Sequence, residues 1–137
     1  ATIFGEERSE LGAFARASAA QLGLTLMPDP EPQVGTFFRS DHVPFAKAGV
    51  PSLYVEHGWT FSDYPPRRGH EIRQNYTANH YHAPSDEFTE DFVFDGAVQQ
   101  GLLGLLTILE IADDDGWPNW HEGQEFRAAR VRMMSGR

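Results

Sequence analysis

The amino-acid sequence predicts a layered α/β fold with a mainly parallel sheet. Short apolar segments suited to strands alternate with segments of helical spacing, in the order strand, helix, strand, short helix, strand, loop, long helix. Of the 137 residues, 40% are hydrophobic and 12% are aromatic, which is a globular composition. The strands are few for this architecture, and the first begins at residue 1. We therefore expect the chain to be part of a larger domain.

The first half of the chain predicts two strands around a helix. Residues 1–4 suit a strand that stops at Gly5, and residues 24–27 suit a second strand. The helix expected over residues 6–22 has Ser9 as a candidate N-cap and Gly23 just past its end, and its shared apolar face consists of Leu11, Phe14, Ala15 and Leu22. Three prolines predict an irregular connection over residues 28–36.

Another helix and strand follow this connection. Ser40 can cap a short helix that Gly49 ends, and residues 51–56 form a largely apolar strand segment. Arg39, Asp41 and His42 lie where the loop enters this helix. Such a charged trio is either a salt-bridged cap or part of a functional site.

Residues 57–79 predict a long irregular loop rich in aromatic residues. Loops of this length inside compact domains tend to be binding loops or lids. We expect Trp59, Phe61 and Tyr64 to form the rim of a substrate pocket. The alternative is that these rings only pack the loop onto the domain.

The clearest helical pattern runs from residue 92 to about residue 112. We expect its apolar face to be core, and that face consists of Phe94, Ala97, Val98, Gly101, Leu102, Leu105, Leu106 and Leu109. Residues 1–112 are thus expected to belong to one domain, with residues 113–137 as a tail. We expect the aromatic residues of the tail to pack back onto the domain and its basic end, residues 127–137, to trail off.

Charge and cysteine content narrow the possible ligands. Eleven basic and twenty acidic residues give a net charge of −9, which argues against a nucleic-acid partner and favours a cationic or free-amine ligand. Without cysteine, any metal must be held by histidine and carboxylates. No apolar run approaches the length of a membrane span.

The strongest candidate site is the pair Tyr81 and His82. Pro84 disfavours helical geometry at Ala83, so the segment is expected to be extended, with the two side chains on opposite sides unless a twist aims both into one cleft. A neutral imidazole can bind zinc, an acid such as Asp86 can orient it, and a phenol can donate to a developing oxyanion. The alternative is a polar surface loop that carries two histidines.

Four motifs together resemble the co-catalytic di-zinc aminopeptidase family. They are RSDH at residues 39–42, PF at 44–45, GVP at 49–51 and YHAPSDE at 81–87, and the resemblance covers about residues 3–112. It implies a three-layer α/β/α sandwich with a mainly parallel mixed sheet and an active site at the carboxyl ends of its strands. This chain would be the C-terminal part of that domain.

The resemblance also implies roles for individual residues. His82 would be a zinc ligand, Tyr81 would stabilise the oxyanion and Asp86 would support the ligand from behind. Asp41 and His42 would shape the pocket wall, and Arg39 would fix the loop or a substrate carboxylate. The family holds two zinc ions, but the other ligands and the general base have no counterpart here. The chain alone is therefore expected to lack a complete metal site and to be inactive.

The function implied is that of a zinc aminopeptidase acting on a peptide or small amide through a metal-activated water. The N-terminal part of the catalytic domain would be its structural partner, and an extracytoplasmic location fits the family. The alternatives are a glutaminyl-cyclase-like or carboxypeptidase-type zinc enzyme, or a non-catalytic binding domain on the same fold.

Overall fold

A small mixed sheet lies at the centre of the protein. The structure, a computed structural model, describes residues 1–61 and 64–136. Strand β1 (Thr2–Phe4) lies between β2 (Met27–Pro28), which is parallel to it, and β3 (Tyr54–Glu56), which is antiparallel. The predicted α/β class is confirmed. The observed sheet has one parallel and one antiparallel pair, and the three-layer sandwich stays a prediction.

The second strand starts later than its sequence predicts because the preceding residues end a helix. Gly23 takes a left-handed φ of 65°, and the Leu24 amide donates to the Ala19 carbonyl over 2.8 Å. Leu24 therefore belongs to the helix terminus and not to the strand. Pro28 pairs with Ile3, which is possible because β2 lies at the edge of the sheet.

The helix predicted for residues 6–22 is interrupted. A 3-10 helix, η1 (Glu6–Arg8), precedes α1 (Leu11–Gln21), and Ser9 between them is extended with φ −148°. Ser9 forms an antiparallel bridge with Trp120, and Glu10 occupies the N-cap position of α1. The prediction that Ser9 caps this helix is therefore wrong, because Glu10 takes the N-cap position and the buried Ser9 Oγ has no hydrogen-bond partner among the described residues.

The connection to the third strand is more regular than its prolines suggested. It contains the 3-10 helices η2 (Pro32–Val34) and η3 (Thr36–Arg39), followed by α2 (Val43–Lys47). The N-cap position of α2 is His42, and Ser40 accepts a backbone hydrogen bond from the Val43 amide instead of capping with its side chain.

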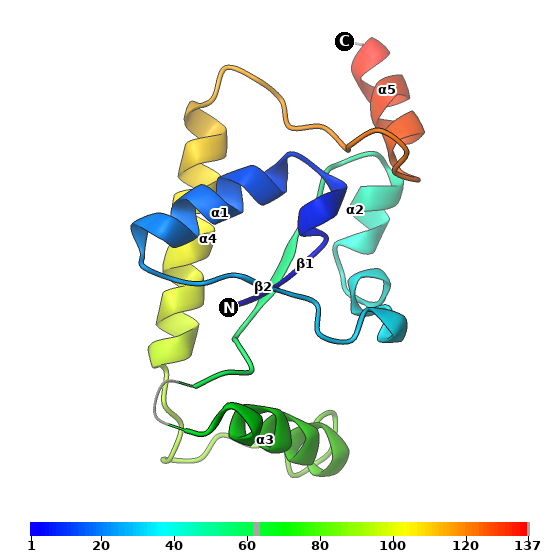
Figure 1. The fold of residues 1–137 in the computed structure, drawn as a ribbon. Helices are drawn as coiled ribbons and strands as arrows, with labels where there is room; N and C mark the ends of the chain where they lie inside the picture. The colour runs from blue at the N-terminus through cyan, green and yellow to red at the C-terminus, as the bar shows by residue number, and fades with distance from the viewer. Residues whose placement is uncertain (62–63, 137) are drawn as a thin grey trace.

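The segment predicted as a long loop contains a helix, α3 (Pro66–Asn79). The residues within this helix are mostly polar, so the sequence has no apolar stripe from which the helix could be predicted. Pro66 occupies a first-turn position that favours a helix start. In Figure 1 this helix lies below the sheet, apart from the crossing pair α1 and α4.

The predicted long helix is confirmed as α4 (Asp95–Asp113), but its predicted core face is largely exposed. Leu103 is buried, whereas the face itself exposes 58% of Val98, 52% of Leu105 and 48% of Leu109. Helix α4 packs mainly on α1, which covers only one side of it (Figure 1). No helix in the described part of the chain has the length and apolarity needed to cross a membrane.

The core joins the sheet to the C-terminal segment. Phe4, Phe37, Ala46, Trp120 and Phe126 form one buried cluster. The tail does not trail off, because residues 127–135 form a helix, α5 (Arg127–Ser135). Arg130 of α5 is buried and donates to the Pro118 carbonyl over 2.8 Å. The division of the chain at residue 112 stays a prediction.

Candidate functional site

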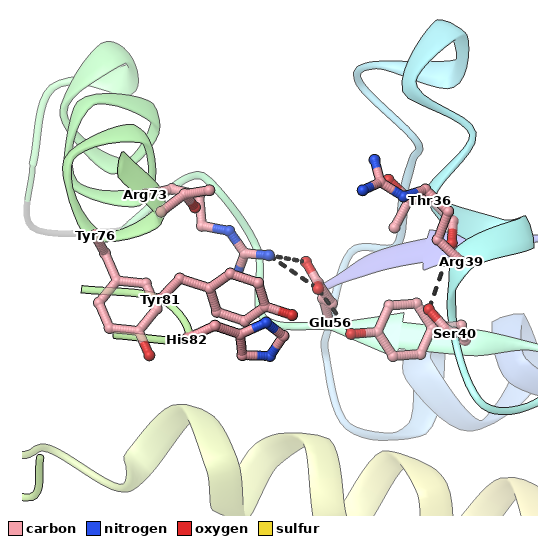
Figure 2. Close-up of a pocket in the computed structure, with 10 residues that line it drawn as sticks. Thr36, Arg39, Ser40, Glu56, Arg73, Tyr76, Tyr81 and His82 are labelled. Carbon is pink, nitrogen blue, oxygen red and sulfur yellow. Dashed lines mark hydrogen bonds and ion pairs between the residues drawn. The ribbon is translucent and has the colours of Figure 1, made fainter. Parts of the chain in front are cut away.

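A pocket of about 500 Å³ opens between η3, β3 and the C-terminal part of α3. Figure 2 shows its residues converging from these separate segments. They are Thr36, Arg39, Ser40, Tyr54, Glu56, Arg73, Tyr76, Thr77, Tyr81 and His82. Three residues predicted from the sequence, Arg39, Tyr81 and His82, thus line the same pocket.

Tyr81 and His82 lie in a tight turn that directly follows α3. The amides of His80 and Tyr81 both donate to the Tyr76 carbonyl, over 2.9 and 3.0 Å. His82 has φ 59°, the only positive φ of a non-glycine residue in the described part of the chain. The expected extended conformation is therefore wrong, because the helix end turns the chain back on itself.

This turn places the two side chains together. The ring centroids of Tyr81 and His82 are 3.8 Å apart and their planes differ by 22°. Both rings point toward the Glu56 side of the pocket in Figure 2. Alternating sides, as in a strand, would have separated them. The twist that the sequence left open thus occurs and aims both into one cleft.

Asp86 interacts with another residue than the one expected. The Tyr76 hydroxyl donates to its Oδ1 over 2.7 Å, and this bond is the largest cause that raises the pKa of Tyr76. Within residues 64–136 no hydrogen bond joins Asp86 to His82. Asp86 thus fixes a residue of the pocket wall, and its role behind a metal ligand stays a prediction.

His42 lies behind the pocket wall and Asp41 is exposed. The His42 ring packs edge-on against Phe37 with centroids 4.5 Å apart and stacks on Tyr54, which lines the pocket. Burial lowers the pKa of His42, and its Nε2 is buried without a hydrogen-bond partner among the described residues. His42 therefore packs behind Tyr54 and is not among the residues that line the cavity.

Trp59, Phe61 and Tyr64 are not among the residues that line this pocket. The ring centroids of Trp59 and His70 are 5.0 Å apart, and the Phe61 ring packs edge-on against the Tyr64 ring. Gly69 of α3 approaches so closely that an added Cβ would lie 1.9 Å from the Trp59 carbonyl oxygen. These rings pack the loop onto α3, and their predicted role at the rim stays a prediction.

Sequence reasoning missed a charged network at the base of the pocket. Arg73 Nη2 donates to both carboxylate oxygens of Glu56 over 2.9 Å, and the Tyr54 hydroxyl donates to Glu56 Oε1 over 2.7 Å. Burial, followed by the bond to Glu56, raises the pKa of Tyr54 to about 12. The position of Glu56 at the end of a predicted strand was a usable signal, but Arg73 had none because α3 was not predicted.

The described residues do not form a zinc site by themselves. No group of three or more histidine, cysteine or acidic residues in the described ranges 1–61 and 64–136 could hold a metal. Glu56 is engaged by Arg73 and Tyr54, so His82 is the pocket residue with metal-binding chemistry left to offer. The pocket can nevertheless supply a phenol donor, an imidazole and the Arg39 cation.

The comparisons point to one family. A family model described as peptidase family M28 matches residues 2–103, which include the whole pocket lining. Neither the curated proteins nor the solved structures gave a match.

Proposed function

The chain belongs to peptidase family M28, and we propose that it forms the C-terminal part of the catalytic domain of a zinc-dependent aminopeptidase. Peptidases of this family are generally zinc-dependent. The observation that carries the proposal is the shared pocket of Tyr81 and His82, whose rings stack on one side of it. We also propose an extracytoplasmic location, as in the resemblance.

In this proposal each pocket residue acts through its own chemistry. The Tyr81 phenol donates a hydrogen bond to the carbonyl oxygen of the scissile bond as that oxygen gains negative charge. His82 offers one imidazole nitrogen as a zinc ligand, and polypeptide outside these 137 residues supplies the remaining ligands and the general base. In this proposal the chain alone is inactive, which is consistent with the absence of a metal-holding cluster among residues 1–61 and 64–136.

The exposed face of α4 supports the need for further polypeptide. Val98, Leu102, Leu105 and Leu109 expose between 44% and 58% of their surface along one helix face. A contiguous apolar face of this kind marks a contact surface. We assign it to the rest of the catalytic domain.

A carboxypeptidase-type activity is the second candidate, and Arg39 favours it. Arg39 lines the pocket, is exposed and forms no ion pair within the described residues. A planar guanidinium is suited to bind a substrate carboxylate in a bidentate manner. An Arg39→Gln change that weakens binding of peptides with a free C-terminus, and not of amidated ones, would favour this candidate.

Two substitutions in the complete enzyme test the leading proposal. Tyr81→Phe should keep zinc and lower kcat by about a hundredfold, which is the scale of a lost oxyanion donor. His82→Ala should lose metal as well as activity. The measurements are the zinc content and steady-state kinetics of both variants. Unchanged turnover with full zinc content in both would refute the assignment.

A further inference from the structure

Helix α3 is poorly anchored by apolar contacts. Apart from side-chain contacts such as that of Arg73 with Glu56, it does not pack along any other helix or strand in the described part of the chain. Most of its residues are exposed, including Ile72 and Tyr76. Isolated helices of this length are marginal in water. Something other than apolar burial must therefore help to hold α3 in place.

The loop before α3 provides one attachment, at the first turns. Gly69 is buried against the Trp59 carbonyl and the Phe61 ring. This contact lies far along the helix from residues 81 and 82. A hinge at the N-terminal end of α3 would leave the turn at its other end free to swing.

Arg73 provides the second attachment, halfway along α3. Its Nη2 binds both oxygens of Glu56 at the end of β3, and its Nη1 lies 3.1 Å from His57 Nε2. The Glu56 and Arg73 side chains are only 12% and 27% exposed, so solvent screens this ion pair less than a surface pair. Figure 2 shows the guanidinium reaching from the helix across to Glu56, beside Tyr81 and His82.

We propose that Arg73, held by Glu56, is a positioning residue that fixes α3, and through it the turn of Tyr81 and His82, against the sheet. The turn is tied to Tyr76, less than one turn of helix beyond Arg73, because the amides of His80 and Tyr81 donate to the Tyr76 carbonyl. Glu56 and His57 engage both terminal nitrogens of Arg73. Its importance for catalysis rests on the proposed function, but its effect on α3 does not.

Hydrogen exchange in the 137-residue chain tests the structural step without any activity. Arg73→Gln removes the charged contact, which should lower the protection of α3 amides about tenfold or more and leave α4 amides unchanged. Glu56→Gln keeps an acceptor for Tyr54 and should have the same effect on α3. The double variant should be no worse than either single variant, because both remove one interaction.

Arg68→Gln is the matched control on the same helix. Arg68 pairs with Glu71 inside α3 over 3.4 Å, and both side chains are more than half exposed. Its loss should change α3 protection little. Unchanged protection in Arg73→Gln, or an equal loss in α3 and α4, would overturn the proposal.

Kinetics of the complete enzyme test the catalytic step. Arg73→Gln should lower kcat about tenfold with KM nearly unchanged. A misplaced Tyr81 would lose a hydrogen bond that forms mainly in the transition state. Arg73→Lys retains the charge opposite Glu56 but cannot also reach His57, so it should recover part of kcat. A change confined to KM, or no recovery by lysine, would overturn the positioning role. An enzyme without peptidase activity would refute the proposed function and leave the exchange result standing.

Discussion

His57 is a titratable side chain in contact with the charged network of Glu56 and Arg73. Burial, and then the nearby Arg73 cation, lower its pKa below the ordinary value of 6.5, while Glu56 opposes the shift and the N-terminal amine adds to it. A guanidinium only donates, so His57 Nε2 must accept from Arg73 Nη1 and carry no proton. Protonation of His57 would replace this contact with repulsion.

The stability of the chain should therefore depend on pH through His57. Its pKa is lower in the folded than in the unfolded chain, so the unfolded chain takes up the proton first as the pH falls. Stability should be full above about pH 6.5 and should decrease below it. Chemical unfolding between about pH 7.5 and about pH 5 measures this slope.

His57→Gln is the appropriate comparison because glutamine keeps an acceptor for Arg73 without titrating. Its slope should be shallower than that of the parent chain. His42 still contributes in the same direction, because burial lowers its pKa too. Equal slopes in parent and variant would exclude His57 as a source of the pH dependence.

At the scale of elements, a helix with regular apolar spacing could be predicted from the sequence, whereas a helix held by polar contacts was missed. Helix α4 was predicted almost to its ends because its apolar residues repeat regularly. Helix α3 was missed because Arg73, Glu56 and loop packing hold a mostly polar segment. The break at Ser9 was equally hidden, since its partner Trp120 lies more than one hundred residues away.

The same division applies to the candidate site. Tyr81, His82 and Arg39 were found through motif order, and all three line the pocket. The stacking of the first two was not predicted, because it depends on the end of a helix that the sequence did not reveal. The family resemblance drawn from these motifs is confirmed.

The loop before α3 should behave as a packing element. Trp59→Ala should lower the free energy of unfolding by about 2 kcal/mol, less than for a fully buried ring, because the ring packs near His70 and is only partly buried. Tyr64→Ala, at a 54% exposed ring, should cost little. Thermal unfolding of both variants checks this. A rim role would appear instead as a changed preference among substrate side chains with the melting temperature preserved.

Gly69 should tolerate no side chain. A Cβ would lie 1.9 Å from the Trp59 carbonyl oxygen and 2.8 Å from the Phe61 ring, so Gly69→Ala forces the loop and α3 apart. We expect loss of amide protection in α3 even though alanine is the better helix former. Gly101→Ala in α4, where nothing lies within 4 Å of the added carbon, should instead be neutral or stabilising. Equal protection of α3 in Gly69→Ala and parent would contradict the contact.

At the scale of the whole molecule, the exposed face of α4 dominates the solution behaviour expected of the isolated chain. Leu105 and Val98 are more than half exposed, so replacing both with glutamine removes little buried contact. This double variant should associate less than the parent in sedimentation experiments and keep its melting temperature. Leu103→Ala on the buried side of the same helix should instead lower stability by about 2–5 kcal/mol. Identical sedimentation of parent and double variant would show that the face does not drive association.

The buried Trp120 shows that the hydrophobic core extends further along the chain than the match to the family does. Its ring is fully buried among Phe4, Phe37 and Phe126, and its Nε1 donates to the Gly49 carbonyl over 3.2 Å. Both Trp120 and Phe126 lie beyond the residues 2–103 that identify the family. The hydrophobic interior is thus completed by a stretch that carries no family signature, and a chain shortened to the recognisable part would expose the aromatic rings on which its central strand rests.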